Sequence, residues 1–434
     1  MEARDLPLVT IDPAGSTDLD QALHIARRAP GFRVSYAIAD VAAFVPPGGP
    51  VDVEAHARVE TLYAPDEKTP LHPAVLSEGA ASLLPGQDRP ALLWQLDLDA
   101  DGQLERTEVR RAVVRSRRRL SYEESQQLLD GDSPPEVLEL LRVVGRLREQ
   151  IEADRGGVSL PIPEQEVVPL DGGYALALRS SLPVEGWNAQ LSLLTGMAAA
   201  QIVLESGVGI LRTLPPARDE DVQGLRRAAA GLGVAWAAGE SYPELVRRLD
   251  PAVPTHAALL QEATGLMRGA GYLALDGGGR PEPERLVHAA IAAPYSHVTA
   301  PLRRLVDRYA GEACVAACAG VDVPEWVLAA LLALPEEMAR GDRKAGELDR
   351  ACVDLVEAAL LTGREGETFP AVVVDVSATG GVVQLADPPV RGRCDGAGLP
   401  LGERVVVRLV TASVDQRTVR FEPAAGPLQD PVGR

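Results

Sequence analysis

Three aspartates lie close together near the N-terminus, in the segment TIDPAGSTDLDQAL that spans residues 10–23. Asp18 and Asp20 are two positions apart, so in an extended chain their side chains point to the same side, with Asp12 shortly before them. Three carboxylates that converge without cations repel one another and have raised pKa values. Oxygen ligands of this kind select hard cations such as Mg²⁺ or Mn²⁺. The spacing alone predicts either a divalent metal site or an acidic turn at a strand end.

A neutral side chain, Gln21, follows these aspartates at a position where a fourth acid could stand. An amide can coordinate a cation through its carbonyl oxygen, but it is a weaker ligand than a carboxylate. We therefore expect one metal position of such a site to be weakened, with Mn²⁺ able to substitute for Mg²⁺.

The overall composition limits the partners that this chain can take. It has 434 residues, of which 46% are hydrophobic, and a formal net charge of −19. This length predicts two or three domains, and the negative charge argues against coating nucleic acid through bulk electrostatics. A local basic channel remains possible, because arginines gather in RRAVVRSRRRL (residues 110–120) and RRLVDR (residues 303–308). Taken alone, each cluster is more typical of a solvated face than of a binding site.

The four cysteines, Cys314, Cys318, Cys352 and Cys394, contain no C-x-x-C pair. This pattern indicates a reducing, cytoplasmic setting rather than a disulfide framework. Cys314 and Cys318 could share a helical face and hold a metal, but no second pair of ligands is near. We expect both of them to be small core residues.

No targeting or membrane segment is expected. The first residues include Glu2 and Asp5 and contain no long apolar run, so a signal peptide is not predicted. The uncharged run of residues 186–204 carries five polar side chains, which suit a buried helix better than a membrane span.

The elements around the aspartates read as strands. Residues 6–11 form an apolar run that delivers the aspartates at its C-terminal end. Residues 22–26 and 32–39 flank the turn APG and predict a β-hairpin, whose second arm alternates apolar and other residues. Residues 91–116 repeat the pattern around an Asp-Gly turn.

Helices dominate the middle of the chain. For the segment SPPEVLELLRVVGRLREQIEADRGG, we expect Ser133 as N-cap, Pro134 as first helical residue and Gly156 as the stop. Four later segments, beginning near residues 219, 255, 300 and 324, are helical by period and punctuation. We predict an α+β domain over residues 1–362, with an antiparallel sheet and packed helices.

After residue 366 the sequence changes to short strands separated by Gly and Pro breaks. Five such strands over residues 367–423 predict a small all-β barrel of the OB type. Residues 424–434 are expected to be a disordered tail.

Several motifs resemble those of the ribonuclease II / ribonuclease R (RNB) family, in order along the chain. TIDPAGSTDLDQAL resembles the signature T-I-D-x-x-x-x-x-D-x-D-D-A, and residues 36–92 resemble the family's I-A-D-V, Y-x-P-D, P-M-L-P and L-S-x-x-x-x-S-L-x-P segments. YSHVTAPLRRLVD resembles Y-A-x-x-T-S-P-I-R-R-Y-x-D, and GELDRACVDL resembles the A-E-R-D-x-x-D segment. The C-terminal strands resemble the family's OB-fold RNA-binding domain.

The resemblance implies a processive hydrolytic exoribonuclease that degrades single-stranded RNA from the 3′ end to nucleoside 5′-monophosphates. It also implies two-metal catalysis with Mg²⁺, no action on DNA, and a monomer in the cytoplasm. Two features depart from the pattern: no N-terminal cold-shock domain precedes the signature, and Gln21 replaces the fourth aspartate. The first departure suggests a wider channel mouth that tolerates duplex RNA with a 3′ overhang.

The resemblance also assigns roles to single residues. Asp12, Asp18, Asp20 and Gln21 would hold the metal ions, with Asp20 most critical for the chemistry. Arg303 would face the scissile phosphate, and Arg304 would be either a phosphate neighbour or a helix-surface residue. Tyr63 would stack on the terminal base, since stacking grips any base. Glu347 would contact the RNA end. The residues to which these roles are assigned are Asp12, Asp18, Asp20, Gln21, Tyr63, Arg303, Arg304 and Glu347.

Two alternatives remain open. The chain could be a catalytically weakened RNB-fold module that binds RNA, a possibility that Gln21 raises. It could also be specialised in trimming structured precursors such as tRNA, which the motifs do not separate from general decay.

Overall fold

A seven-stranded sheet forms the centre of the N-terminal half in this computed structural model, which describes residues 1–160, 164–170, 173–179, 181–279, 281–385 and 387–424. Its strands in spatial order are β1 (Glu2–Ala3), β8 (Leu104–Arg115), β7 (Asp88–Leu98), β4 (Gly31–Ala39), β3 (Gln21–Arg28), β2 (Val9–Asp12) and β9 (Arg118–Ser121). Both predicted hairpins, β3–β4 and β7–β8, are confirmed. The sheet is not antiparallel throughout, because β1 runs parallel to β8 and β2 parallel to β9. Long intervening segments allow these two parallel pairings at the edges.

The central strand β4 is buried on both of its faces. Phe32, Val34, Tyr36 and Ile38 share one face, as predicted, and belong to the larger hydrophobic core. Small residues on the other face join a second core. The sheet is therefore an inner layer, which holds the ends of its strands in fixed positions.

Helices α3 (Glu136–Arg155), α4 (Pro183–Ser206) and α8 (Leu305–Ala319) pack around the larger core. Helix α4 contains the uncharged run and is buried along much of its length, as expected for a core helix. In the part of the chain that the structure places, no helix is long and apolar enough to cross a membrane.

Two local predictions were wrong. Helix α3 begins at Glu136 with Pro135 as its N-cap, not Ser133. The helical conformation is disfavoured for a residue that precedes a proline, and this applies to both Ser133 and Pro134. The helix therefore begins only after Pro135. Cys314 is buried as expected, but Cys318 is exposed near the end of α8, where the helix leaves the core.

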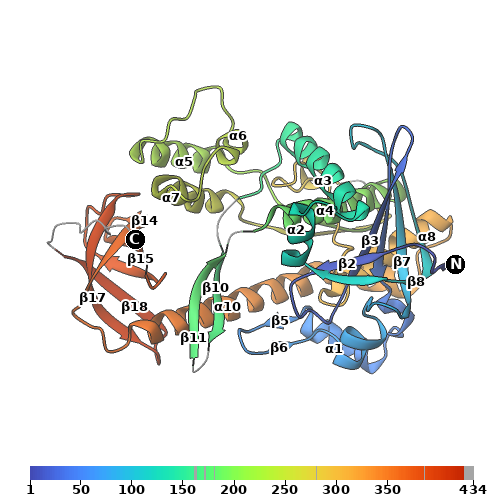
Figure 1. Cartoon of the computed structure of the whole chain (residues 1–434), viewed down its shortest axis with the longest axis horizontal. Coiled ribbons are helices and arrows are strands. Elements are labelled where there is room, and N and C mark those ends of the chain that lie inside the picture. The colour runs from blue at the N-terminus through green and yellow to red at the C-terminus, as the bar shows by residue number, and fades with distance from the viewer. Residues whose placement is uncertain (161–163, 171–172, 180, 280, 386, 425–434) are drawn as a thin grey trace.

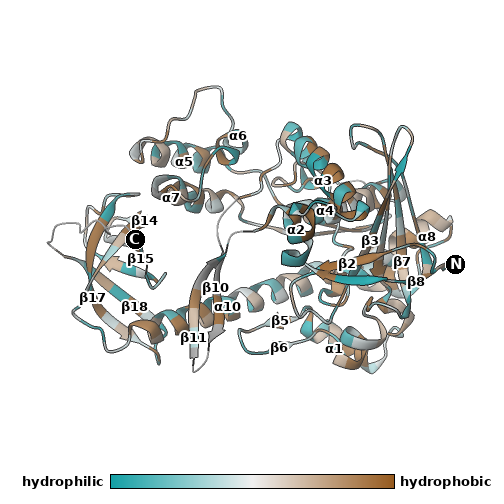
Figure 2. Cartoon of the chain, in the orientation of Figure 1, coloured by the Kyte–Doolittle hydropathy of each residue, from teal (hydrophilic) through white to brown (hydrophobic). Residues whose placement is uncertain are grey.

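Figure 1 shows the long helix α10 (Leu334–Leu361) running from the sheet domain to a β-barrel at the other end of the molecule. Hydrophobic and hydrophilic residues alternate along it (Figure 2), as suits a helix with one packed face. The barrel is closed in the order β14-β15-β16-β18-β17, which confirms the five-stranded OB-like prediction. Its strands are β14 (Thr368–Ser377), β15 (Gly380–Leu385), β16 (Arg391–Asp395), β17 (Arg404–Ser413) and β18 (Thr418–Pro423). The expected tail, residues 424–434, lies outside the described residues except for Ala424.

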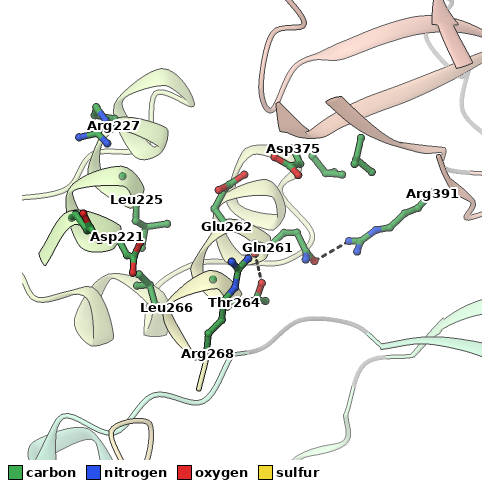
Figure 3. A pocket seen from close by; sticks show the side chains of 15 residues that line it. Asp221, Leu225, Arg227, Gln261, Glu262, Thr264, Leu266, Arg268, Asp375 and Arg391 are labelled. Carbon is green, nitrogen blue, oxygen red and sulfur yellow. Dashed lines mark hydrogen bonds between the residues drawn. The ribbon is translucent and has the colours of Figure 1, made fainter. Parts of the chain in front are cut away.

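A group of short helices packs beside the barrel. The Arg391 guanidinium of the barrel donates a 2.9 Å hydrogen bond to Gln261 of α7, and Figure 3 shows this contact at the edge of a cavity of about 500 Å³. The Arg391 amide also donates to Glu357 of α10 at 2.7 Å. These contacts join the barrel to both neighbours. The short helices are α5 (Asp219–Gly231), α6 (Tyr242–Arg247) and α7 (Pro254–Ala263).

The remaining elements are shorter or peripheral. They are the helices α1 (Pro50–Arg58), α2 (Tyr122–Asp130) and α9 (Glu325–Leu331), and the paired strands β5 (Leu62–Tyr63) with β6 (Lys68–Thr69), β10 (Glu164–Leu170) with β11 (Gly173–Arg179), and β12 (Val208–Thr213) with β13 (Gly271–Asp276). The β5–β6 hairpin, hereafter the flap, lies next to the aspartate segment and is described below.

Candidate active site

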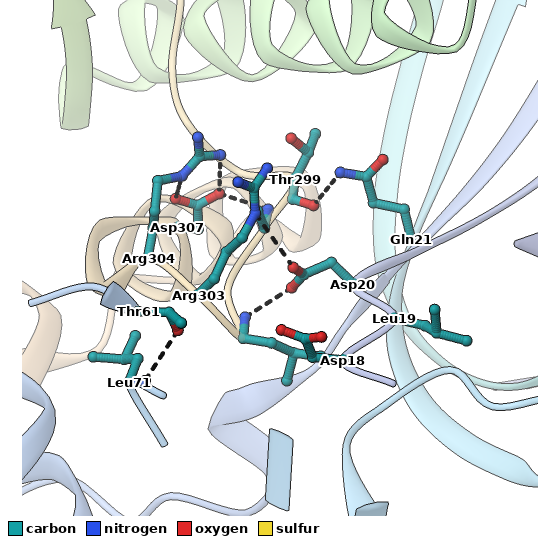
Figure 4. Close-up of polar contacts among 12 residues, drawn as sticks. Asp18, Leu19, Asp20, Gln21, Thr61, Leu71, Thr299, Arg303, Arg304 and Asp307 are labelled. Atoms are coloured by element: carbon teal, nitrogen blue, oxygen red, sulfur yellow. Dashed lines mark hydrogen bonds and ion pairs between the residues drawn. The ribbon is translucent and has the colours of Figure 1, made fainter. Parts of the chain in front are cut away.

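The aspartate segment connects two neighbouring strands of the sheet. Asp12 is the last residue of β2, and Asp20 directly precedes β3. The side chain of Asp20 is buried, and its Oδ1 accepts a 2.7 Å hydrogen bond from the Leu302 amide. Its Oδ2 lies 3.8 Å from Nε of Arg303 (Figure 4). The structure thus brings together the predicted Asp20 and Arg303, which are far apart in sequence.

The ionisation of two aspartates is strongly perturbed. Burial raises the pKa of Asp20 to about 8, although Arg303 and the Leu302 amide act in the opposite direction. Burial, and then the charge of Asp18, raises the pKa of Asp12 to about 7. The Oδ2 atom of Asp12 is buried and has no hydrogen-bond partner among the described residues. A hard divalent cation would satisfy this oxygen and stabilise the ionised form of Asp12, so the unpartnered carboxylate oxygen fits such an ion in its chemistry.

Asp18 makes a different contact from its two neighbours. Its Oδ1 lies 3.0 Å from the ammonium group of Lys68 on the flap, and the same ammonium lies 2.9 Å from Glu78. Burial alone would lower the pKa of Lys68, but the hydrogen bonds to Glu78 and Asp18 outweigh it and raise that pKa. Lys68 is therefore a fixed positive charge beside Asp18.

The three aspartates do not form one compact cluster. Over the described ranges, no group of three or more His, Cys, Asp or Glu side chains is placed so that it could hold a metal ion. Asp20 is directed to the Leu302 amide and Asp18 to Lys68. The arrangement leaves Asp12 as the aspartate with an unpartnered oxygen.

Gln21 is occupied at both ends of its amide. Its Nε2 donates a 2.8 Å hydrogen bond to the carbonyl of Thr299, and its Oε1 accepts from the Tyr36 hydroxyl. A main-chain carbonyl can only accept, so the NH₂ group must face Thr299 and the oxygen must face Tyr36. Figure 4 shows Gln21 reaching Thr299. In this orientation the amide links β3 to the loop before Arg303.

The flap is attached to the arginine loop by main-chain hydrogen bonds. The Thr61 amide donates to the Arg303 carbonyl, and the Leu305 amide donates to the Val59 carbonyl, both at 3.0 Å. These bonds place Tyr63 near the carboxylates, and burial followed by the charge of Asp18 raises the pKa of its hydroxyl. Tyr63 is nevertheless 51% exposed, so part of this residue is accessible to a ligand.

A cleft of about 770 Å³ begins at Tyr63 and extends along α10 to the barrel. Its lining residues include Asp349 and Arg350 of α10 and Arg391 of the barrel. Glu347 is exposed on α10 and is not among the cleft-lining residues that the structure describes. The contact of Glu347 with an RNA end therefore stays a prediction, whereas Asp349 is observed to line the same cleft as Tyr63.

The two neighbouring arginines have different environments. The side chain of Arg303 is 47% exposed and faces Asp20. The guanidinium of Arg304 instead forms two hydrogen bonds of 2.9 and 3.0 Å with the buried Asp307. Asp307 also accepts from the Ala300 amide at 2.7 Å. The expectation of a helix-surface residue was wrong for Arg304, because it directly precedes α8 and its side chain is only 19% exposed. Its geometry favours a structural role, and leaves Arg303 as the arginine available to an anionic ligand.

Sequence reasoning missed several of these contacts. The Leu302 amide and the Thr299 carbonyl are main-chain groups, which no residue type reveals. Lys68 could have been noticed, because it follows Tyr63 by five residues in YAPDEK and a short hairpin would place the two side by side. Together, buried carboxylates, an exposed arginine and an exposed aromatic ring beside a long cleft suit a polyanion with flat bases.

Comparison with known families gives two matches. The profile of the RNB domain matches residues 1–315, and that of the RNase II-type exonuclease C-terminal S1 domain matches residues 367–424. The second match coincides with the β-barrel.

Comparison with curated proteins finds relatives that are longer than this chain. Ribonuclease R of Escherichia coli is 26% identical over 472 residues, which cover 97% of this chain and 57% of that protein. Ribonuclease R of Aquifex aeolicus is 27% identical over 464 residues, which cover 97% of this chain and 64% of that protein. The chain therefore spans about 57% to 64% of the length of these two relatives.

Solved structures share the fold. Mycoplasma genitalium RNase R in complex with ribose methylated single-stranded RNA superposes with a TM-score of 0.86 at 19% identity, covering 98% of this chain and 72% of that one. Yeast Ssd1, described as a pseudonuclease, superposes with a TM-score of 0.74 at 18% identity, covering 94% and 51%. The fold thus occurs both in a ribonuclease and in a protein described as inactive.

Proposed function

Because the chain belongs to the RNB-domain family, we propose that it is a hydrolytic exoribonuclease that degrades single-stranded RNA from the 3′ end to nucleoside 5′-monophosphates. The observation that carries this proposal is the exposed guanidinium of Arg303 beside the buried carboxylate of Asp20, next to the half-exposed ring of Tyr63. An arginine at this position can pair with a phosphate and with the negative charge that develops on it.

The cleft gives the RNA strand a path to these residues. The strand would run along α10 from the barrel residue Arg391, and its last base would stack on Tyr63. Such stacking grips any base, so it suits an enzyme that removes nucleotides without regard to sequence. Besides burial, the charges of Arg303 and Asp20 act on the pKa of the Tyr63 hydroxyl, so a strand whose terminal base stacks there would have its phosphate near this pair.

The carboxylates would hold a divalent cation, Mg²⁺ or Mn²⁺, and such an ion would supply activation of water and stabilisation of the leaving oxygen. Asp12 would contribute its unpartnered oxygen, and Asp18 and Asp20 are the further ligands that the resemblance implies. Two-metal catalysis, expected from the resemblance, stays a prediction. Around these ligands, Leu302 fixes the orientation of the Asp20 carboxylate, and Arg303 orients the phosphate.

A second candidate is an RNA-binding module with weak or no catalysis. Two observations favour it: Gln21 is neutral and hydrogen-bonded to neighbours through both its nitrogen and its oxygen, and the described residues contain no three-carboxylate metal cluster. The fold of yeast Ssd1, described as a pseudonuclease, shows that this architecture occurs without nuclease function.

One gel assay separates the two candidates. A 5′-labelled oligoribonucleotide is incubated with the full chain and Mg²⁺ or Mn²⁺, beside a deoxyribonucleotide of the same sequence. The exonuclease shortens the RNA from its 3′ end, leaves the DNA intact, and loses activity in Asp20→Asn but not in the exposed-surface control Asp322→Asn. Retained binding without shortening would support the module and contradict the exonuclease.

The same assay tests structured substrates. Mycoplasma genitalium RNase R has been solved in complex with double-stranded RNA, and we propose that this chain also accepts duplex RNA with a 3′ overhang. Digestion should continue into the duplex. A sharp halt several nucleotides before the duplex would show that the cleft admits single strands only.

A further inference from the structure

Asp18 already has a cation in contact with it. The ammonium of Lys68 lies 3.0 Å from Asp18 Oδ1 and 2.9 Å from Glu78 Oε1, so two carboxylates from different segments hold it in place. The side chain of Lys68 is only 28% exposed, which reduces screening of its charge by water. The contact therefore belongs to the carboxylate site and is not a mobile surface pair.

The choice of lysine at this position is informative. The chain contains only two lysines, Lys68 and Lys344, and all its other side chains of this charge are arginines. Arginine presents a planar fork, whereas lysine presents a compact point charge on a flexible stem. A compact charge between two carboxylates resembles a bound metal ion more closely than a guanidinium does.

The other side chains expected to bind metal ions already have contacts of their own, apart from one oxygen of Asp12. The oxygen of Gln21 accepts from Tyr36 and its nitrogen donates to Thr299, so neighbouring residues hold its amide in place. Asp20 accepts from the Leu302 amide and faces Arg303. Asp12 has the unpartnered oxygen. With Glu78, four carboxylates therefore stand against two built-in positive charges, Lys68 and Arg303. The two negative charges that remain when all four are ionised match one divalent ion and not two.

We propose that the ammonium of Lys68 takes the place of a second metal ion, so that the centre binds a single divalent cation in place of the two that the resemblance implies. The proposal rests on the proposed nuclease function and specifies how its charge is supplied. In hydrolysis one P–O bond forms from water, the P–O3′ bond breaks, and the O3′ leaving group takes up a proton from water. Lys68 forms and breaks no bond, and stabilises the negative charge on the phosphate.

The flap connects this charge to the end of the substrate. Lys68 is paired with Tyr63 across the β5–β6 hairpin. The flap is in turn hydrogen-bonded to the Arg303 loop through Thr61. A base that stacks on Tyr63 would therefore bring its phosphate toward both Lys68 and Arg303. Binding of the RNA end would in this way also position the phosphate against the two positive charges.

The test counts metal ions in the full chain without RNA. Mn²⁺ is titrated into the wild type, Lys68→Met and the matched control Lys344→Met, and free Mn²⁺ is measured by electron paramagnetic resonance. We expect one Mn²⁺ per chain for the wild type and the control. Lys68→Met should bind a second Mn²⁺. Its affinity for this second ion should exceed that of the wild type by about tenfold or more, because the positive charge next to Asp18 has been removed.

Two further variants keep the test decisive if Lys68→Met does not fold. Lys68→Gln provides a second neutral variant if Lys68→Met is not folded by circular dichroism, and Lys68→Arg, which keeps the charge, should bind one Mn²⁺. Two equally tight Mn²⁺ ions in the wild type, with no change in Lys68→Met, would overturn the proposal.

The RNA assay separates this proposal from the proposed function. If the wild type shortens RNA and binds two Mn²⁺, the role of Lys68 alone is overturned. If it neither binds Mn²⁺ nor shortens RNA, both proposals are overturned. Shortening of RNA with one bound Mn²⁺, together with a second site in Lys68→Met, supports both.

Discussion

The amide nitrogen of Gln21 donates a 2.8 Å hydrogen bond to the main-chain carbonyl of Thr299, which joins strand β3 to the loop that carries Arg303. A carboxylate at position 21 could not donate this bond and would place an acceptor against a buried acceptor. We therefore expect Gln21→Asp to lower the free energy of unfolding by roughly 1–3 kcal/mol. It should not accelerate RNA decay.

Urea unfolding and the gel assay check this expectation, with the exposed helical residue Gln223→Asp as control. Unchanged stability together with strongly faster decay in Gln21→Asp would show that position 21 needs a fourth carboxylate after all.

Arg303 should be needed for turnover and not for folding. Its side chain is 47% exposed and its only ion pair in the described structure is the 3.8 Å contact with Asp20. Arg303→Ala should lower the single-turnover rate by about 10²–10³, the cost of removing a donor to a developing charge. The melting temperature should stay close to that of the wild type. A similar loss in the exposed control Arg343→Ala would refute a specific role.

Arg304 should behave in the opposite way. Its guanidinium pairs with Asp307, whose side chain is buried, so Arg304→Ala leaves an uncompensated charge. We expect a loss of about 3–5 kcal/mol in the free energy of unfolding, measured with urea. Adding Asp307→Asn should recover part of the loss, because the amide oxygen can still accept from the Ala300 amide. Full stability with weakened RNA binding would instead assign Arg304 to the phosphate.

Tyr63 should contribute through its ring and not through its hydroxyl. Tyr63→Ala should weaken binding of a short oligoribonucleotide by about 1–3 kcal/mol, the range for one stacked base. Tyr63→Phe should retain affinity within twofold or so. Fluorescence anisotropy with the inactive Asp20→Asn background measures both. Equal losses in the two variants would indicate a hydrogen bond from the hydroxyl.

Cation binding should stabilise the protein more at high pH. Burial raises the pKa of Asp20 to about 8 and that of Asp12 to about 7. Between about pH 4 and these values, the cation-free folded chain binds protons that the unfolded chain has released, so its stability falls as pH rises. Above about pH 8 both carboxyl groups have already lost these protons, so Mg²⁺ binds without displacing them. The stabilising effect of Mg²⁺ should therefore be greatest above about pH 8.

Thermal melts at several pH values, with Mg²⁺ or with a chelator, check this expectation. In Asp20→Asn the cation-free melting temperature should depend less steeply on pH than in the wild type. A larger effect of Mg²⁺ at low pH than at high pH would contradict the assignment of these carboxylates to the cation.

Patterns within short windows were the predictable part of this fold. The β3–β4 hairpin, the buried helix α4 and the five-stranded barrel all follow from periodicity and turn residues. The position of the α3 N-terminus was mispredicted, because the capping pattern was weighed more than the constraint of two consecutive prolines.

The candidate site was predictable as a set of residues and not as a set of contacts. Asp20 and Arg303 could be named from their motifs, yet the contacts that distinguish this centre join segments far apart in sequence. Lys68 is 50 residues from Asp18, and Thr299 is 278 residues from Gln21. Such pairings depend on the packing of the whole sheet and on main-chain groups, which local patterns do not encode.

Helix α10 has 28 residues and is about 42 Å long, and it links the sheet domain with the barrel. If RNA follows the cleft along α10, the helix sets a fixed distance between the barrel, which would bind the strand first, and the carboxylates beside Tyr63, where it would be cleaved. A strand longer than that interval is held at both places, and a shorter one is held only beside Tyr63. The helix would then act as a ruler that sets the length of the last oligonucleotide released.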